Sequence, residues 1–495
     1  MRKGGRSPRR WGDPEQHMNF FNFFTDEQKK NIHEASLTIL EETGMVVKNA
    51  DALEIFTKHG CKADGNRVRF PRKIVAEKMA SVPPTYTFTA QVPELDVTLP
   101  GDRPVIVTGS SAPNVVDPVT GEERRGTSRD VANIAYLINE LKGFDVFSIS
   151  ILADDAPPDM RSLYRFYPAL KNCKKPVRSN TPTIPDLEKV LELGYSIAGG
   201  KEAYFERPFI NHHYCPVISP LTYDVESTAS VVHLAKLGLP VYGTIVPNAG
   251  MTSPMSLLGT LTLGNAEFLS LSFLMQAIKP GSGVIYAVLS TVGDMRNGDY
   301  APGAIETGIL QMGHSEMARF YNVPSGGYIG LTNSQSNDVQ NGYETSLNTA
   351  AALLAGSDLF NMGGLLGGLM AFDFSKAVID NEIALNLKHL KKGIPYDQND
   401  FCLELINKTG PGGNYMVLPH TAKNLRKVTH YPTIGVRGFR SKWINDGKPN
   451  AAAQAAALAK KILTKPNPNA LAADIDKKVR DHIPGLPDGQ AIWYE

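Results

Sequence analysis

The sequence has little cysteine and no excess of charge of either sign. Its 51 lysines and arginines stand against 50 aspartates and glutamates, a formal net charge of +1 over 495 residues, so it lacks the basic footprint of a nucleic-acid-binding protein. The four cysteines form no CxxC pair and no cluster with zinc-ligand spacing, and neither HxH nor HExxH occurs. We therefore expect buried thiols in a reducing compartment, no metal site and no nucleic-acid partner.

From the first residues we expect no signal peptide, and from the polar interruptions of the longest apolar segment we expect no membrane span. The first ten residues, MRKGGRSPRR, are basic, but no apolar segment follows them, and we predict a flexible basic tail over residues 1–20. Residues 255–278 approach the length of a membrane span, yet polar residues such as Asn265 and Glu267 interrupt them. We expect a buried helix there and a soluble, cytoplasmic protein.

Residues 21–100 show a mixed pattern on a small scale. Thr25 and Gln28 form a capping box ahead of a helix that reaches Thr43. Further helical patterns and short β-rich runs follow, at 50–59, 71–81, 85–90 and 94–99. We assign residues 21–100 to an N-terminal α/β subdomain.

Beyond Gly101 the sequence alternates short β-rich apolar runs with segments of helical length, as stacked βα units do. We expect strands at 104–110, 144–150, 175–180, 209–214, 240–246, 283–290, 325–331 and 358–364. Eight units close a barrel, whereas an open doubly wound sheet would need a GxGxxG turn that GSSAPNVVDP lacks. The expected fold is an α/β (β/α)₈ TIM barrel over 101–392. A helical extension over 393–495, with an Ala-rich helix at 450–463, would wrap the barrel or contact another subunit.

In a TIM barrel the functional side chains lie at the mouth, the end formed by the C-terminal ends of the strands. Residues 324–344, PSGGYIGLTNSQSNDVQNGYE, run from a strand through a polar loop into a helix. On the fourth strand either His213 or both of its neighbours point inward, because side chains alternate along a strand. A packed histidine and a functional one are equally compatible with the pattern.

The functions of two further motifs are undecided or weakly supported. MGGLLGG at 362–368 could cradle a phosphate after the eighth strand, or its glycines could serve close packing of the backbone. No GxSxG turn supports a serine hydrolase. The residues alone thus predict a barrel enzyme whose amide- and hydroxyl-rich mouth suits a small, polar or zwitterionic substrate, with the reaction undetermined.

Several passages, spread over nearly the whole chain and in the same order as in the family, resemble the trimethylamine methyltransferase superfamily. Members of this superfamily move a methyl group from an amine to the cobalt of a separate corrinoid protein. The matching passages include HEASLTILEETGMVV at 33–47, SPLTYD at 219–224, GMTSPMSLLGTLTLGNAEFL at 250–269, VIDNEI at 378–383 and LPHT at 418–421. Members that act on trimethylamine carry pyrrolysine in the loop after the seventh strand. Here that loop, TNSQSNDVQ, holds only ordinary residues, so the chain resembles the non-pyrrolysine branch.

The resemblance implies a substrate and partners. The non-pyrrolysine branch demethylates quaternary amines such as glycine betaine, proline betaine and carnitine, and a quaternary ammonium leaves as a neutral amine without an added electrophile. We expect methyl transfer from a quaternary amine, foremost glycine betaine, to Co(I) of a cognate corrinoid protein. The chain itself would bind no cofactor tightly and would form a homo-oligomer.

The resemblance also directs the choice of site residues. Aromatic faces would hold the quaternary cation, and the candidates on or after the strands are Tyr214, Tyr286, Tyr328 and Phe372. Asn333 and Ser334 are the candidates for the catalytic segment. Together with His213 and the Gly363-Gly364 turn, they are also candidates for contact with the carboxylate of a betaine. Arg296 is the alternative partner of that carboxylate.

Two rival functions stay open. In one, MGGLLGG binds a phosphate-bearing cofactor such as flavin in a barrel enzyme of another class. In the other, the chain keeps the family fold but only binds a betaine without catalysis.

Overall fold

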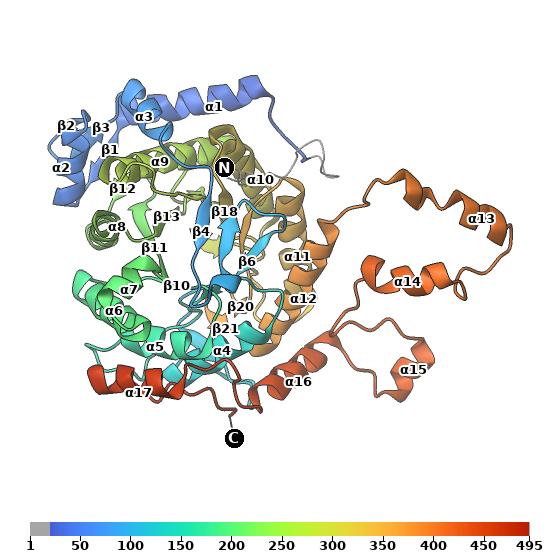
Figure 1. Cartoon of the computed structure of the whole chain (residues 1–495). Coiled ribbons are helices and arrows are strands. Elements are labelled where there is room, and N and C mark those ends of the chain that lie inside the picture. Colours follow the sequence, from blue (N-terminus) through green and yellow to red (C-terminus); the bar gives the residue numbers. More distant parts are fainter. Residues whose placement is uncertain (1–19, 495) are drawn as a thin grey trace, which may run out of the picture.

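The computed structural model describes residues 20–494. The basic tail predicted for residues 1–20 lies, apart from its last residue, outside the described residues. Figure 1 shows a ring of helices around a set of short strands, with an arm of the chain extending to one side.

Eight short strands fall at the positions where the alternating pattern predicts them. They are β6 (Val105–Val107), β9 (Phe147–Ser148), β10 (Val177–Ser179), β11 (Ile210–Ile218), β13 (Val241–Ile245), β15 (Tyr286–Ala287), β18 (Ser325–Gly327) and β19 (Leu359–Asn361). Each is followed by at least one helix. These are α4 (Ser128–Glu140), α5 (Leu163–Asn172), α6 (Ile184–Ala198) with α7 (Lys201–Glu206), α8 (Glu226–Leu237), α9 (Leu257–Ile278), α10 (Ile305–Tyr321), α11 (Val339–Leu354) and α12 (Phe374–Leu390).

The eight strands pair in parallel in two sets of four. One set runs in the order β9, β10, β11, β13, and the other in the order β15, β18, β19, β6. Between the sets there is a single parallel bridge on each side, Val107 with Val146 and Ile245 with Val288. The chain therefore has the mixed α/β architecture that the alternation predicts, with its parallel strands surrounded by helices.

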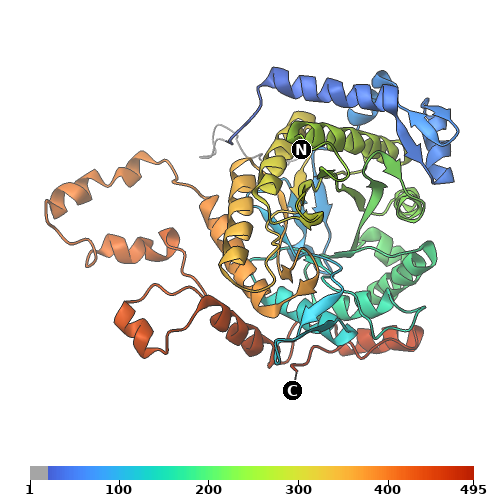
Figure 2. The same cartoon turned by 180° about the vertical axis from the view of Figure 1, so that it is seen from behind.

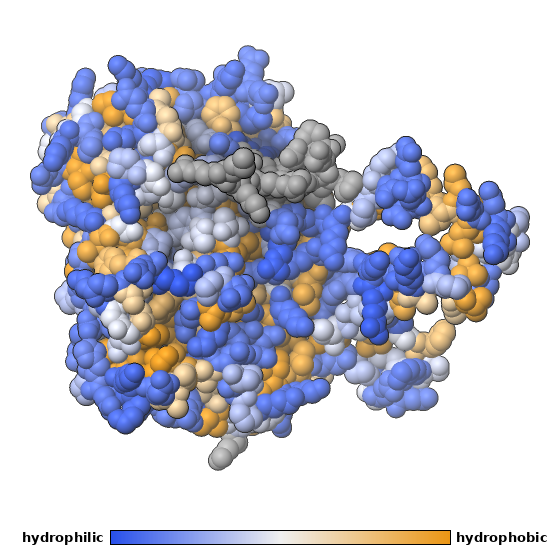
Figure 3. Space-filling model, in the orientation of Figure 1, coloured by the Kyte–Doolittle hydropathy of each residue, from blue (hydrophilic) through white to orange (hydrophobic). Residues whose placement is uncertain are grey.

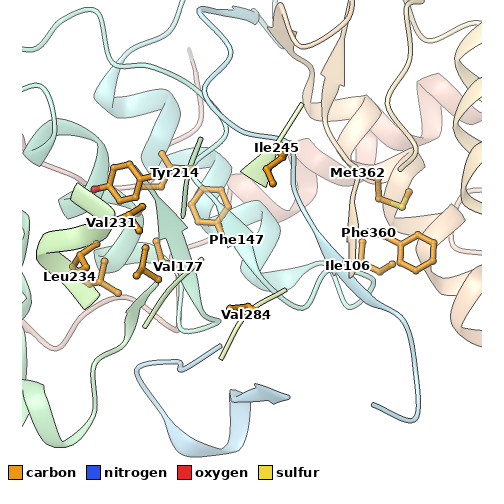
Figure 4. Packing of buried hydrophobic residues seen from close by; sticks show 14 of the residues in the cluster. Ile106, Phe147, Val177, Tyr214, Val231, Leu234, Ile245, Val284, Phe360 and Met362 are labelled. Atoms are coloured by element: carbon orange, nitrogen blue, oxygen red, sulfur yellow. The ribbon is translucent and has the colours of Figure 1, made fainter. Parts of the chain in front are cut away.

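Side chains on the strands alternate between the helices and the interior. Figure 4 shows Ile106, Phe147, Val177, Tyr214, Ile245 and Phe360 within the large core between strands and helices. A second, smaller core lies inside the strands and contains Val105, Val146, Tyr242, Ile285 and Leu359. This period of two decides which residues can form a site inside the ring of strands.

A hairpin from the N-terminal region fills the interior at the N-terminal ends of the strands. It consists of β4 (Tyr86–Phe88) and β5 (Val97–Leu99), which pair antiparallel, and its Tyr86, Phe88 and Leu99 belong to the inner core. Asn211 on β11 anchors the hairpin by donating to Thr89 O at 2.8 Å and accepting from Thr89 N at 3.1 Å. Figure 1 views the molecule from this end, with β4 in front.

The rest of the N-terminal region packs beside β11. Its elements are α1 (Asp26–Thr38), η1 (Ile39–Thr43), β1 (Met45–Val47), α2 (Ala50–Lys58), β2 (Lys62–Asp64), β3 (Arg67–Arg69), α3 (Arg72–Met79) and η2 (Pro93–Leu95). The predicted capping box of Thr25 and Gln28 is present at α1. β1 pairs with β12 (Thr222–Tyr223), which folds back on the end of β11, so this region shares a sheet with the fourth strand.

The long apolar segment predicted as a buried helix is α9. It spans 22 residues, and 78% of its most apolar stretch is buried inside the protein. Glu267 within it is fully buried and accepts hydrogen bonds from Leu221 N and Ser219 Oγ, both at 2.7 Å. The helix thus serves as a core helix on which the N-terminal region packs.

Several short strands lie around the mouth. They are β7 (Asn114–Val116), β8 (Glu123–Arg125), β14 (Asn248–Ala249), β16 (Thr291–Asp294), β17 (Asp299–Ala301), β20 (Leu365–Leu366) and β21 (Ala371–Phe372). β16 and β17 form a hairpin after the sixth strand, and β20 and β21 form another after the eighth. Figure 2 shows the molecule from the mouth side.

The C-terminal region divides into a projecting part and a packed part. The projecting part holds η3 (Gln398–Phe401), α13 (Leu403–Thr409), α14 (Pro419–Val428) and α15 (Arg440–Asn445), and it stands away from the ring in both Figure 1 and Figure 2. The packed part holds α16 (Ala451–Leu463), which contacts α12 and α4, and α17 (Ala473–His482), which contacts α6. The predicted Ala-rich helix at 450–463 is confirmed as α16.

Candidate active site

Six polar or aromatic residues form a group inside the strands, above the apolar inner core. We call Arg178, His213, Cys215, Tyr242, Tyr300 and Tyr328 the mouth group. Arg178, His213, Cys215 and Tyr242 lie on β10, β11 and β13, Tyr328 directly follows β18, and Tyr300 lies on β17. Alternation along β11 turns His213 and Cys215 inward, while Tyr214 between them turns toward the helices.

Arg178 is the most constrained member of the mouth group. Its side chain is buried, its Nη2 donates to Asn361 Oδ1, and its guanidinium lies over the Tyr242 ring at 5.7 Å from the centroid. Its Nε and Nη1 have no hydrogen-bond partner within residues 20–494. Burial lowers the Arg178 pKa to about 10, so at neutral pH a buried cation with two unused donors faces the interior. Such a group fits an anionic ligand, since an unpaired buried charge is costly.

His213 is stacked against Tyr242 beside this arginine. The two rings lie 6.0 Å apart at an angle of 25°, and His213 Nδ1 has no partner in the described part of the chain. Burial, with the positive charges of Arg178 and Arg165, holds the His213 pKa well below its usual value. The imidazole is therefore neutral at physiological pH and offers a polar edge without adding charge.

Cys215 shows that solvent reaches the interior at this end. Its residue is exposed although it lies on the inner face of β11, and its Sγ lies 2.8 Å from Thr244 Oγ1 on β13. The protein packed around the thiol raises its pKa above the usual value. Cys215 is thus a neutral thiol on an open interior surface.

Tyr300 and Tyr328 are the half-buried aromatic members of the mouth group. Tyr300, Tyr328 and Cys215 lie close enough to one another for their ionisations to be coupled. Burial raises the pKa of Tyr328 to about 12 and also raises that of Tyr300. Both hydroxyls stay protonated at neutral pH, so these rings can present neutral aromatic surface to a cation.

A second buried arginine lies next to the mouth group. Arg165, from α5, donates to Ser111 Oγ at 3.0 Å and to Ser179 Oγ at 2.8 Å, and its Nε donates to Ile151 O at 3.3 Å. Burial lowers its pKa to about 10. Its Nε and Nη2 are occupied by these oxygens, and its charge adds positive potential near His213.

The loop after β18, which the sequence singles out, is held together by its own hydrogen bonds. Asn333 Nδ2 donates to Tyr300 O at 2.9 Å, and Asn333 Oδ1 accepts from Gly303 N at 2.8 Å. Ser334 Oγ donates to Ser336 O and to Asp338 Oδ1, both at 2.8 Å. The geometry makes Asn333 a link to the segment that carries Tyr300, and Ser334 a support for the start of α11.

The structure places the other proposed aromatic residues in the core. Tyr286 is fully buried and its hydroxyl donates to Asn265 Oδ1 of α9 at 2.9 Å. Tyr214 Oη lies 2.8 Å from Thr181 Oγ1. Phe372 is fully buried and packs edge-on against Phe374. These three contact other core residues rather than the mouth group, whereas Tyr328 and His213 come together at Arg178.

The glycine-rich segment 362–368 forms a tight turn whose amides are engaged. Gly364 has φ of +79°, and a side chain there would strike Phe372. Its N–H donates to Asp380 Oδ2 at 2.8 Å, and the N–H groups of Gly367 and Gly368 donate to Ser334 O and Thr332 O. The backbone donors that a phosphate would need are therefore used within the protein.

Two other expectations concern Arg296 as a partner of the substrate carboxylate and the presence of a metal site. Arg296 lies at the surface, with its side chain 89% exposed and paired with Asp294. Within residues 20–494 no group of three His, Cys, Asp or Glu side chains could hold a metal ion.

Sequence reasoning missed Arg178, Tyr242, Tyr300 and Cys215. The signal for Arg178 was present, because period-two alternation in KPVRSN places a charged side chain on the face opposite Val177, in a strand buried on both sides. Tyr300 had no such signal, since it follows a hairpin turn whose position only the folded chain decides.

The parallel strands with intervening helices give the chain a mixed α/β architecture, and polar side chains gather in its interior toward the C-terminal ends of the strands. The family model described as trimethylamine methyltransferase (MTTB) matches residues 1–485, and the chain belongs to this family. It is therefore a methyltransferase, as the sequence predicts.

Relatives match over nearly their whole length. The chain is 34% identical to the glycine betaine methyltransferase of Desulfitobacterium hafniense (strain Y51), covering 94% of this chain and 96% of the relative. It is 28% identical to the trimethylamine methyltransferase MttB of Desulfitobacterium hafniense (strain DSM 10664 / DCB-2), covering 95% of each. Among solved structures, the monomethylamine methyltransferase MtmB of Methanosarcina barkeri matches with a TM-score of 0.47 and 13% identity, over 93% of each chain.

Proposed function

We propose that this methyltransferase takes a methyl group from a betaine, foremost glycine betaine, and transfers it to the Co(I) of a separate corrinoid protein. The relative named glycine betaine methyltransferase and the family match support this reaction. The proposal treats the eight strands as a (β/α)₈ barrel closed by the two single bridges, in a cytoplasmic enzyme.

The observation that carries the substrate class is the buried, incompletely paired guanidinium of Arg178. A betaine has a carboxylate and a quaternary ammonium in one small molecule. The carboxylate would accept hydrogen bonds from Nε and Nη1 of Arg178, the two donors that have no partner in residues 20–494. Trimethylamine has no anionic end and would leave this charge unpaired.

The closed and open ends of the interior give the bound betaine a direction. The β4–β5 hairpin fills the N-terminal ends of the strands, so the substrate enters from the mouth with its carboxylate toward Arg178. Its ammonium then lies nearer to Tyr300 and Tyr328, whose neutral rings attract a desolvated cation by about 0.5–2 kcal/mol each. The methyl groups face outward, where the corrinoid protein docks.

The chemical step needs no acid–base catalysis by the protein. The bond between nitrogen and one methyl carbon breaks, the electron pair of that bond stays on nitrogen, and the electron pair of Co(I) forms the new bond to carbon. The leaving amine is neutral, so no proton is transferred. The residues of the mouth group therefore bind and orient the substrate and keep bulk water from its charges.

Two rival functions receive less support. A phosphate-bearing cofactor would need amides of the 362–368 segment that already donate within the protein. A protein that only binds betaine would share the mouth group but not the reaction.

A panel of amines tests the proposal. The purified chain is mixed anaerobically with cob(I)alamin and glycine betaine, proline betaine, carnitine or trimethylamine, and methylcobalamin is followed by absorbance. We expect substrate-dependent methylation with glycine betaine and none with trimethylamine. Turnover of trimethylamine would contradict the role of Arg178, and betaine binding measured by calorimetry without methylation would support the binding-only rival.

A further inference from the structure

The projecting part of the C-terminal region carries three short helices without a buried residue. We call residues 394–447 the C-terminal arm. Within the described residues, α13, α14 and α15 contain no buried residue. Helices of 6 to 10 residues are not stable in water on their own sequence alone and depend on packing of an apolar face. Residues 430–434 anchor the arm, because Ile434 is buried and His430 and Thr433 bond to Glu382 of α12. The helices of the arm lack the packing contact that would stabilise them.

The arm presents a large apolar surface. Its most exposed large apolar side chains lie between 53% and 90% exposed and are Ile394, Tyr396, Leu403, Met416, Val417, Val428, Tyr431 and Phe439. Together they present on the order of 1,000 Å², which is comparable with the ~800 Å² that each partner contributes to a stable interface. Figure 3 shows such hydrophobic residues, in orange, on the arm.

A second unpartnered apolar surface lies on α11 of the same chain. Val339, Tyr343, Leu347 and Leu354 are between 46% and 83% exposed, and their spacing places them on one face of the helix. We call these four residues the α11 stripe. Figures 1 and 2 both show α11 on the side of the ring from which the arm projects.

We propose that the C-terminal arm packs on the α11 stripe of a second copy of this chain, and that the two copies exchange arms reciprocally. The single chain carries both apolar surfaces, so a second copy supplies the complement of each. Both surfaces lie on the same side of the molecule, so one two-fold axis makes both contacts at once and closes the dimer. The arm projects sideways in both views rather than over the mouth, so exchange leaves the mouth free for the corrinoid protein.

Sedimentation velocity of the full-length chain at low micromolar concentration tests the dimer. We expect a species of twice the 53.9 kDa chain mass. Val417→Asp with Phe439→Asp in the arm, or Leu347→Asp in the stripe, should weaken the dimer at least tenfold, because a charge would be buried in an apolar contact. Val119→Asp is the matched control, since Val119 is 53% exposed and lies after β7 on neither surface.

Mixing the two kinds of variant tests which surfaces meet. A dimer of one arm variant and one stripe variant retains one intact contact, whereas a dimer of either variant with itself retains none. We expect the mixture to dimerise more strongly than either variant alone. A monomeric wild type, dimers that survive both sets of substitutions, or a mixture no stronger than its components would overturn the proposal. Circular dichroism confirms that each variant is folded.

Discussion

The two ends of the strand interior are built from opposite kinds of side chain. At the N-terminal ends, Phe88 and Leu99 of the hairpin pack with Val105, Ile285 and Leu359 in a closed apolar core. At the mouth, charged, aromatic and thiol side chains converge, and two donors of Arg178 have no partner in the described chain. Tyr242 lies between the two, touching Tyr86 and Phe88 on one side and His213 on the other.

The difference indicates that the apolar end stabilises the fold, whereas the mouth is suited to bind a ligand. The apolar end needs no ligand, because burial of its side chains stabilises the fold by itself. Arg178 lowers the stability of the fold, because burying an incompletely paired charge costs free energy of folding. A residue that lowers stability and points into a solvent-accessible interior is best explained by what it binds. Substitutions at the two ends should therefore have opposite consequences.

Arg178→Met should have the largest effect on activity. It removes the proposed anion partner of the substrate, a loss of about 2–5 kcal/mol, so kcat/KM for glycine betaine should fall by roughly thirtyfold to several thousandfold. The melting temperature should stay the same or rise, because an unpaired buried charge is replaced by an apolar chain of similar length. Activity assays and thermal unfolding measure both. An activity within threefold of wild type would remove Arg178 from the site.

Phe88→Ala, at the opposite end, should act on stability instead. Removing a fully buried phenylalanine leaves a cavity and should lower the free energy of unfolding by about 3–5 kcal/mol. The KM for betaine of the fraction that remains folded should be close to wild type. Urea unfolding with steady-state kinetics at low temperature checks this, and a selective rise in KM would show that the two ends are not independent.

Tyr328→Leu and Tyr286→Leu form a matched pair on neighbouring strands. Tyr328 belongs to the mouth group, so its loss should raise KM several-fold, as expected for about 0.5–2 kcal/mol of cation–π attraction. Tyr286 donates to Asn265 in the outer core, so its replacement should lower the melting temperature with KM unchanged. A rise in KM for Tyr286→Leu, but not for Tyr328→Leu, would assign Tyr286 rather than Tyr328 to the substrate-binding site.

Asn333→Ala should have a smaller effect, because Asn333 acts by positioning the backbone of Tyr300. Losing this bond should cost about 1 kcal/mol and raise KM about fivefold while kcat changes little. Asn333→Asp keeps the acceptor for Gly303 N but loses the donor to Tyr300 O, and should resemble Asn333→Ala. A large fall in kcat for either variant would instead indicate a direct role in catalysis.

The pH profile should show the smallest effect. His213 has a pKa well below its usual value, and the pKa of Tyr328 is about 12, so kcat/KM should be flat from about pH 7 to pH 9. Burial lowers the Arg178 pKa only to about 10, so its guanidinium stays charged throughout this range. A step near pH 6.5 that His213→Gln removes would show that this histidine titrates during turnover.

The alternation of the sequence sufficed to predict the eight strands, the helices after them and the burial of α9. It could not decide which candidate side chains meet. Tyr286 and Tyr328 look alike in sequence, yet one faces α9 and the other Arg178, because a shift of one residue in a strand exchanges the two faces. The loop with Asn333 was chosen for its polarity, and its polar groups prove to bond mainly to one another and to the backbone of neighbouring loops.

By itself, the sequence determined the order of strands and helices and the family, because periodicity and motif order are local or linear properties of the chain. Only the tertiary structure decided that Arg178, from the third strand, Tyr242, from the fifth, and Tyr328, after the seventh, share one space. It also decided that the helices α13, α14 and α15 bury no residue against their own chain. Both depend on contacts between residues far apart in sequence, which the pairing and packing of whole elements bring together or leave apart.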